Sequence, residues 1–181
     1  IVTPDATPAN MIEIMERNGF KNLSGEDDEP AMLLYKKDFQ PCREKKSRIT
    51  CREISTMEDF RTWVELVNTA LHGWDMIDAE HYFTWVKEEA IKIYFAELDG
   101  VPISTCATIQ NGNTASLEFV STLEEYRRKK AAALLSSHAI AELLHNGAET
   151  VTLSACGDSV HLYKSLGFKK YFNNRILKFE L

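Results

Sequence analysis

The sequence predicts a mixed α/β (α+β) domain, in which helices pack on one mixed sheet, preceded by an additional segment. Three features of the 181-residue chain predict this class. Residues 91–121 hold three strand-like runs separated by two tight turns, which is typical of an antiparallel meander. Residues 128–166 alternate between helix, strand and helix patterns, which is typical of a β-α-β crossover. The hydrophobic content of 44% is enough to form a core.

Capping, turn and alternation signals place the elements of the first half of the chain. They predict a helix at 9–19, strands at 31–39 and 48–54, a helix at 55–71 and a helix at 78–89. Thr7 is expected to cap the first of these helices and Asp78 the last. Ser55 and Glu58 form a capping-box pattern for the helix between them.

The second half of the chain is punctuated by turn residues. The expected elements are strands at 91–98, 101–109 and 114–121, a helix at 128–144, a strand at 149–155, a helix at 159–166 and a strand at 175–181. Asp99 and Gly100 form a favoured two-residue hairpin turn. From Arg48 onward the predicted order is therefore β-α-α-β-β-β-α-β-α-β, a mixed domain with antiparallel hairpins and a later crossover.

A run of four cations, residues 127–130, stands at the junction between a strand and the longest helix. The whole chain has 21 Lys and Arg against 27 Asp and Glu, a formal net charge of -6, which argues against bulk nucleic-acid binding. A helix start offers unpaired backbone N–H groups and partial positive charge, so the added cations indicate a site for phosphate or pyrophosphate. Alanines at 131–133 keep that helix start slim. The competing interpretation is a solvated helix face.

Other composition signals bound the function. No run of about 18 apolar residues is present, so no membrane span or membrane partner is expected. The four cysteines are scattered, which is typical of reduced thiols in a cytoplasmic protein. The five histidines lack ligand spacing, so no metal is expected. A Cys-His hydrolase using Cys156 and His161 has the residue types but no spacing that favours contact.

Two stretches resemble motifs of one enzyme superfamily. VSTLEEYRRKKAAALL resembles the acetyl-CoA pyrophosphate loop of the GNAT N-acetyltransferases, commonly written V-A-T-x-P-E-Y-R-x-x-G-x-G/A. LSACGDSVHLYKSLGF resembles a second GNAT stretch, roughly L-x-A-S-x-x-x-x-x-L-Y-x-x-L-G-F. The residues in register are Val120, Thr122, Glu125, Tyr126, Arg127, Ala132, Leu153, Ala155, Leu162, Tyr163, Leu166, Gly167 and Phe168. The ordered pair indicates the GNAT acyl-CoA N-acyltransferase fold over residues 48–181.

The resemblance implies an acetyl-CoA-dependent N-acetyltransferase that transfers an acetyl group directly to a primary amine. Acetyl-CoA would be the donor, and the acceptor would be a small-molecule or peptide amine. The strand backbone of Phe119, Val120 and Ser121 is expected to contact the pantetheine arm. The pyrophosphate is expected on the following turn, at Arg127, Arg128, Lys129, Lys130, Ala131 and Ala132.

Two residues have catalytic roles by the same resemblance. Tyr163 stands where the family commonly has the acid that protonates the leaving thiolate; the alternative is an ordinary packed tyrosine. Glu118 is expected to be the base, or to position a water, and alternation along the strand would put it on the same face as Val120. A solvent-facing glutamate is the competing interpretation. Asp158 is expected to cap the helix that carries Tyr163.

The acceptor pocket of the family lies between the first two helices and the central strands. Here that region holds Trp63, His72, Trp74, His81, Tyr82 and Trp85. These rings suit either a pocket for an amine or an ordinary core face, and the second is the more frequent case.

The loop departs from the family pattern at two positions, since Lys130 replaces the first glycine and Glu124 replaces the proline. A lysine side chain at this glycine position either obstructs the pyrophosphate or folds its ammonium onto it. A noncatalytic module of the same fold, which has lost efficient cofactor binding, is therefore the alternative function.

The N-terminal segment resembles the closing half of the same fold. NMIEIMERNGFK aligns with SVHLYKSLGFKK, so that Gly19 matches Gly167 and Met15 stands where Tyr163 does. We therefore expect residues 1–40 to belong to a remnant or closing half of an upstream GNAT-like unit, joined by a linker at 41–47 to the domain at 48–181. A coincidental helix-Gly-strand pattern is the alternative. An exposed strand edge in this segment would pair with the second domain or with another chain, as in a homodimer.

Overall fold

The computed structural model describes residues 2–22, 29–44, 47–73, 75–157 and 159–179. The strands are β1 (Phe20–Asn22), β2 (Glu29–Tyr35), β3 (Ile49–Glu53), β4 (Ile91–Leu98), β5 (Val101–Asn111), β6 (Thr114–Thr122), β7 (Thr150–Ser154), β8 (Lys169–Asn174) and β9 (Leu177–Phe179). The α-helices are α1 (Met11–Arg17), α2 (Met57–Val67), α3 (Ala79–Tyr82), α4 (Ala131–His145) and α5 (Ser159–Ser165). None of these helices is both long and apolar enough to cross a membrane.

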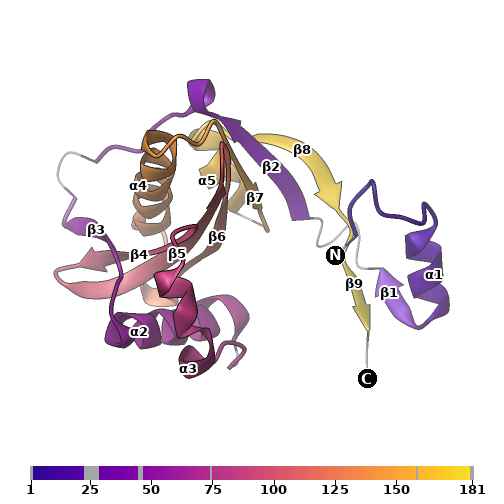
Figure 1. The fold of residues 1–181 in the computed structure, drawn as a ribbon, viewed down its shortest axis with the longest axis horizontal. Coiled ribbons are helices and arrows are strands. Elements are labelled where there is room, and N and C mark those ends of the chain that lie inside the picture. Colours follow the sequence, from indigo (N-terminus) through magenta and orange to yellow (C-terminus); the bar gives the residue numbers. More distant parts are fainter. Residues whose placement is uncertain (1, 23–28, 45–46, 74, 158, 180–181) are drawn as a thin grey trace.

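The main sheet of the described chain has seven strands in the order β3-β4-β5-β6-β7-β2-β8. All neighbouring pairs are antiparallel except β6 and β7, which are parallel and are joined by the crossover helix α4. Figure 1 shows this sheet as the body of the molecule, with a small lobe of α1, β1 and β9 set to one side. The mixed sheet confirms the predicted fold class.

Two hydrophobic cores cover the two faces of the main sheet. The α4-side core packs α4 and α5 on the sheet and includes Leu135, Ile140 and Tyr163. The α2-side core packs α2 on the opposite face and includes Phe60 and Trp63, neither of them exposed to solvent. Burial of both faces agrees with the centres of β4 and β5, where successive residues are buried rather than alternating.

Most predicted strand ranges are confirmed within a few residues. They were accurate because the turns that bound the strands are encoded by a few adjacent residues. Asp99 and Gly100 both have positive φ, as the favoured hairpin turn requires. Helix starts are less accurate. The first helix begins at Met11, too late for a cap at Thr7. The second is capped by the Thr56 side chain, which accepts from the Asp59 N–H, and not by the neighbouring serine. Strands β1 and β8 were not predicted.

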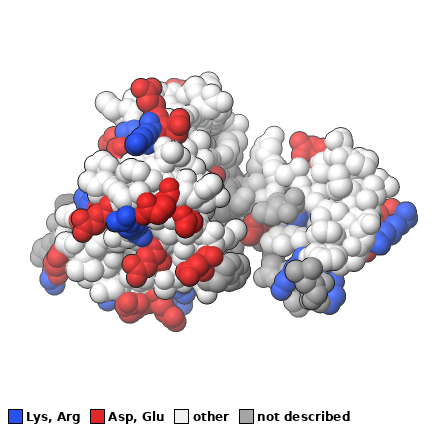
Figure 2. All heavy atoms as spheres, turned by 60° about the horizontal axis from the view of Figure 1, so that its bottom comes forward, with Lys and Arg blue, Asp and Glu red and all other residues white. Residues whose placement is uncertain are grey.

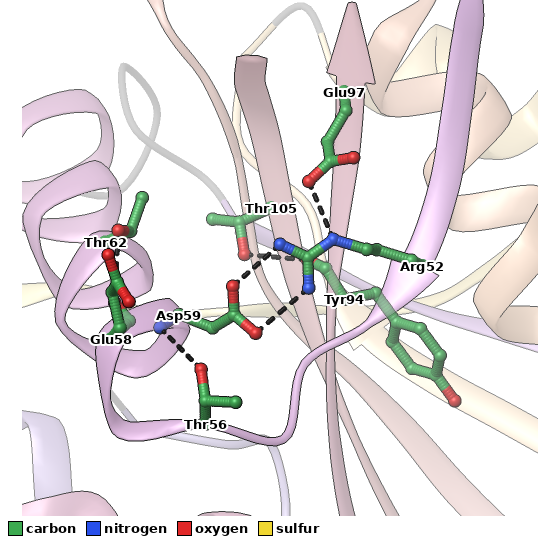
Figure 3. Close-up of polar contacts among 8 residues, drawn as sticks. All are labelled: Arg52, Thr56, Glu58, Asp59, Thr62, Tyr94, Glu97 and Thr105. Carbon is green, nitrogen blue, oxygen red and sulfur yellow. Dashed lines mark hydrogen bonds and ion pairs between the residues drawn. The ribbon is translucent and has the colours of Figure 1, made fainter. Parts of the chain in front are cut away.

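An arginine clamp fastens α2 to the edge of the main sheet. The Arg52 guanidinium on β3 donates two hydrogen bonds to the Asp59 carboxylate on α2, at 2.7 and 3.0 Å. Its Nε donates to Glu97 on β4 at 2.7 Å. Figure 3 shows the guanidinium between the two carboxylates, with Thr56 capping the helix that carries Asp59. The clamp fixes the start of α2 against the sheet.

Strand β2 comes from the N-terminal segment and lies inside the main sheet, between β7 and β8. Its Met32 and Leu34 side chains are almost fully buried in the α4-side core. The connector after β2 runs along α4, where the Cys42 N–H donates to the Ser137 hydroxyl at 2.9 Å. Strand β1, in contrast, pairs with the C-terminal strand β9 in the small lobe.

Candidate functional site

The two parallel strands at the centre of the main sheet separate along their length. Strands β6 and β7 pair only through their first three residues, from Thr114↔Thr150 to Ser116↔Thr152. Strand β6 then continues to Thr122, while β7 ends at Ser154. The separated ends lead directly to the start of α4 from β6 and to α5 from β7. The predicted cofactor and catalytic residues all lie around this opening.

A β-bulge at the opening changes which side chains share a face. Phe119 has a φ of 52°, and Phe119 and Val120 together stand opposite Cys106. Glu118 pairs with Ala107, a member of the α2-side core, whereas Val120 packs on the α4-side core. The expectation that Glu118 and Val120 share a face is therefore wrong, because the bulge interrupts the alternation.

The cationic turn holds two non-glycine residues in the left-handed conformation. Arg128 and Lys130 have φ of 62° and 63°, a conformation that side chains with a Cβ seldom adopt. Helix α4 starts directly after Lys130, and no side chain caps its N-terminus. Helices α2 and α3, in contrast, are capped by Thr56 and Asp78. The N–H groups at the start of α4 are thus left for water or a ligand.

The four cations of the turn take different partners. Arg127 Nε donates to the Thr122 carbonyl oxygen at 3.3 Å, and the Lys129 ammonium lies 4.9 Å from the centre of the Tyr126 ring. The Lys130 ammonium forms an ion pair with Glu44 at 3.0 Å, and this hydrogen bond raises the pKa of Lys130. Lys130 therefore points toward the connector, and its side chain does not lie over the helix start.

Tyr163 lies on α5 and is buried in the α4-side core, with 5% of its surface exposed. Its ring makes an edge contact with Phe168 at 5.8 Å between centroids. Burial is the main cause that raises the pKa of Tyr163 well above its usual value, and the nearby Cys106, Cys156 and Glu118 raise it further. A tyrosine is protonated at neutral pH even without this shift, and burial extends that range to higher pH. The structure brings Glu118 and Tyr163 within electrostatic range of each other.

The aromatic residues of the predicted acceptor region form mainly core. Trp63 is fully buried and stacks on Phe60 at 5.2 Å. It also makes edge contacts with Phe119 at 5.5 Å and Trp85 at 6.3 Å. Tyr82 lies 4.9 Å from Trp85. The interpretation as a core face is the better one for Trp63, and the bulge residue Phe119 rests directly on this aromatic cluster.

Some features of the site lie outside the sequence predictions or outside the described residues. Asp158 and Trp74 belong to positions that the structure does not describe. Within the described ranges, no group of three or more His, Cys, Asp or Glu is arranged to hold a metal ion. Sequence reasoning missed Glu44 as the partner of Lys130, because nothing in the connector marks one acidic residue as facing the turn.

Many solved structures share this fold, among them the following three. A GCN5-related N-acetyltransferase from Kribbella flavida matches with a TM-score of 0.72 and 18% identity, over 96% of this chain and 65% of its own. One from Sphaerobacter thermophilus matches with 0.73 and 19%, over 95% of this chain and 56% of its own. A glucosamine N-acetyltransferase region of a fungal multi-domain β-N-acetylglucosaminidase matches with 0.74 and 12%, over 98% of this chain and 23% of its own. This chain thus spans less than two thirds of each of them.

No curated protein matches the sequence of this chain. The sequence model of the acetyltransferase (GNAT) family, in contrast, matches residues 56–168, which is more than half of the chain. That range includes the bulged strand β6, the cationic turn, α4 and Tyr163. The chain belongs to the acetyltransferase (GNAT) family.

Proposed function

We propose that this protein is an acetyl-CoA-dependent N-acetyltransferase that transfers the acetyl group directly to a primary amine. One observation carries the proposal: an uncapped helix start follows a turn with two residues in the left-handed conformation, beside the opening between β6 and β7. Family membership supports acyl transfer with CoA. The proposal adds that the donor is acetyl-CoA and that the acceptor is an amine.

The residues around the opening fit the donor. The N–H groups at the start of α4 and the cations at 127–130 would hold the diphosphate. Phe119, Val120 and Ser121 would hold the pantetheine arm along β6. The Ser121 hydroxyl oxygen is buried and has no hydrogen-bond partner among the described residues, so it is available to a ligand group. When bound, acetyl-CoA supplies the activated acetyl thioester.

Tyr163 is proposed to hold the proton that the leaving sulfur needs. Its oxygen is protonated at neutral pH, as in an ordinary tyrosine, and burial raises its pKa further. A general acid of this kind contributes about 100-fold or more to a rate. Loss of this proton should therefore not limit the rate below about pH 10, which is the usual pKa of tyrosine.

Glu118 is proposed to receive the proton of the amine, directly or through a water. Its partner across the sheet, Ala107, lies in the α2-side core, so Glu118 stands on the face of the sheet that α2 covers. The aromatic cluster with Phe119 lies on the same face. The amine would therefore approach from the α2 side, while the diphosphate lies at the start of α4.

The first test is calorimetric titration of acetyl-CoA into the protein. We expect micromolar affinity for the parent chain. Two variants separate the contributions of Lys130: Lys130→Gly removes both its Cβ and its charge, and Lys130→Gln removes the charge alone. If only the glycine variant binds, the noncatalytic alternative is supported, because the fold would then have lost its cofactor. If none of the three binds, the proposed diphosphate site is wrong.

The second test is Tyr163→Phe, assayed with acetyl-CoA and a panel of a polyamine, an amino sugar and a lysine-containing peptide. We expect the rate of thiol release to fall about 100-fold while the affinity for acetyl-CoA stays within twofold. Tyr171→Phe, at a tyrosine that is 74% exposed on β8, is the matched control. An unchanged rate in Tyr163→Phe would overturn the acid assignment.

A further inference from the structure

We propose that α1, β1 and β9 are the closing part of a second acetyltransferase-like unit that exchanges strands with the main sheet. In this arrangement the free edge of β9 pairs with a strand of the polypeptide that leads into Val2. The inference does not depend on the proposed activity. It rests on a comparison of the small lobe with the end of the main sheet.

Helix α1 and helix α5 are equivalent in length and in how they end. Each has seven residues, and each is followed two positions later by a glycine with φ near the same value, 90° at Gly19 and 101° at Gly167. The same three backbone hydrogen bonds close both helices. In α1 the Asn18 N–H donates to the carbonyls of Ile14 and Met15, and the Gly19 N–H donates to that of Glu16. In α5 the Leu166 N–H donates to the carbonyls of Leu162 and Tyr163, and the Gly167 N–H donates to that of Lys164. The sequence resemblance between the two segments is therefore also a structural one.

The strand beside each glycine is equivalent as well. Beside Gly167, near the C-terminus, lies the N-terminal strand β2, and beside Gly19, near the N-terminus, lies the C-terminal strand β9. Strand β2 lies antiparallel to β8, and β9 lies antiparallel to β1. A Cβ on Gly167 would meet the Leu34 side chain of β2 at 3.1 Å, and one on Gly19 would meet the Phe179 side chain of β9 at 3.2 Å. Strand β9 thus takes in the lobe the place that β2 takes in the main sheet.

The main sheet has a third strand in this comparison, β7, and in the lobe Val2 lies where that strand would end. In the main sheet the far edge of β2 pairs with β7, and the N–H of Ala155, directly after β7, donates to the Pro30 carbonyl at 3.0 Å. In the lobe, the Val2 N–H donates to the Arg175 carbonyl at 2.7 Å, and the Arg175 N–H donates to Val2 at 2.8 Å. Arg175 lies two residues before β9, as Pro30 lies two residues before Met32. Val2 therefore occupies the position of Ala155, the residue that directly follows a β7-like strand.

The lobe exposes the surface that such a unit would cover. Phe179 is 48% exposed, whereas its equivalent Leu34 is fully buried. Helix α1 carries apolar residues but buries none of them, while α5 buries Tyr163. A pair of strands with one short helix is marginal by itself. Figure 2 shows the lobe set apart from the main body of the molecule.

The hydrogen bonds of Val2 favour an incoming strand over a second copy of this chain. They occupy the Arg175 end of the β9 edge and set an antiparallel direction. Residues progressively further before Val2 would therefore pair with positions progressively closer to Phe179. Pairing of β9 with β9 of a second copy would compete for that end. Both the Kribbella and the Sphaerobacter structures match the lobe together with the main sheet and contain further chain, which agrees with a larger unit.

The experiment grafts the missing strand onto the 181-residue chain. The six residues 149–154, sequence ETVTLS, are inserted directly before Val2 in place of residue 1, and a second chain carries the same residues shifted by one, which reverses the two faces. Alternation from Arg175 turns the Leu177 and Phe179 N–H groups toward the free edge and that of Lys178 toward β1. Hydrogen exchange of these three amides and the mass from light scattering are measured.

We expect at least tenfold slower exchange at Leu177 and Phe179 in the grafted monomer, but not in the parent or the shifted chain. Slow exchange at both amides in a dimeric parent would overturn the proposal in favour of a second copy. Slow exchange at Lys178 alone in all three chains would mean that the edge accepts no such strand. Fast exchange of all three amides throughout would mean that the lobe itself does not form. Each of these last two results also overturns the proposal.

Discussion

The turn after α5 offers a sharp test of how the N-terminal segment is held. Gly167 has a φ of 101°, and a Cβ placed on it would overlap the backbone carbonyl oxygen of Asp38 and lie 3.1 Å from Leu34. The same segment is fixed by a hydrogen bond from Gln40 N to Leu166 O at 3.0 Å and by an ion pair between Lys169 and Asp38 at 2.8 Å. In Gly167→Ala this segment must move away from the turn.

The expected loss of stability has two parts. A non-glycine residue in a left-handed conformation costs about 1–2 kcal/mol. Forcing the backbone and a buried leucine apart costs about 1–3 kcal/mol more, as in an overpacked core. The sum is about 3 kcal/mol for Gly167→Ala. Since 1 kcal/mol shifts the melting temperature of a chain of this size by about 2–4 °C, we expect a decrease of roughly 10 °C.

The matched control is Gly147→Ala. Gly147 has a φ of 94°, close to that of Gly167, but a Cβ there would meet nothing within 4 Å. Only the conformational part applies, so a loss of about 1–2 kcal/mol is expected. Urea unfolding followed by circular dichroism at 25 °C measures both variants. If the two lose the same free energy of unfolding, within about 0.5 kcal/mol, the close contact between Asp38 and the turn does not exist as described.

Two further predictions concern the edge of the sheet and the thiols. In Arg52→Met the mostly buried carboxylates of Asp59 and Glu97 lose their shared cation, so the free energy of unfolding should fall by about 2 kcal/mol, toward the lower end for charged hydrogen bonds because the guanidinium is partly exposed. Arg52 holds the pKa of Asp59 low, so the contribution of the ionised Asp59 to the free energy of unfolding is present above about pH 4 and is lost as the pH falls through the lowered pKa. Urea unfolding of the parent from pH 7 to pH 3 should show this loss, and the same series in Arg52→Met should not. With an aromatic disulfide reagent at pH 8, the exposed Cys156 should react within minutes, whereas Cys51, whose pKa burial raises to about 11, should react only on unfolding. A fast reaction of Cys51, identified by mass spectrometry, would contradict its burial.

The sequence was most informative where structure is local. The hairpin turn at Asp99 is set by two adjacent residues, so the strands on either side were placed correctly. The insertion of β2 between β7 and β8 is a pairing between segments more than a hundred residues apart, and no local pattern encodes it. The bulge at Phe119 was missed although two apolar residues, Phe119 and Val120, stand together there, because a strand buried on both faces can carry the same pattern without a bulge.

The candidate site was predictable to the extent that it follows a motif. The motif put Tyr163 beside the opening, whereas its burial and the resulting rise in its pKa are visible only in the structure. Residue type alone argues against a left-handed conformation at Lys130, since lysine carries a Cβ. The family position, which has glycine there, is the signal that agrees with the observed φ of 63°.

The ion pair between Lys130 and Glu44 bears on the two roles expected for this lysine. Its backbone adopts the shape that the family obtains with glycine, while its ammonium lies on the connector, away from the helix start. Both partners are partly exposed, at 61% and 38% for their side chains, and exposed pairs of this kind contribute little to stability. An anion bound at the start of α4 can therefore compete for the ammonium with little cost to the fold. We therefore predict that Lys130 does not obstruct the site and that its charge adds a contact for a bound anion, in which case Lys130→Gln should weaken the binding of acetyl-CoA.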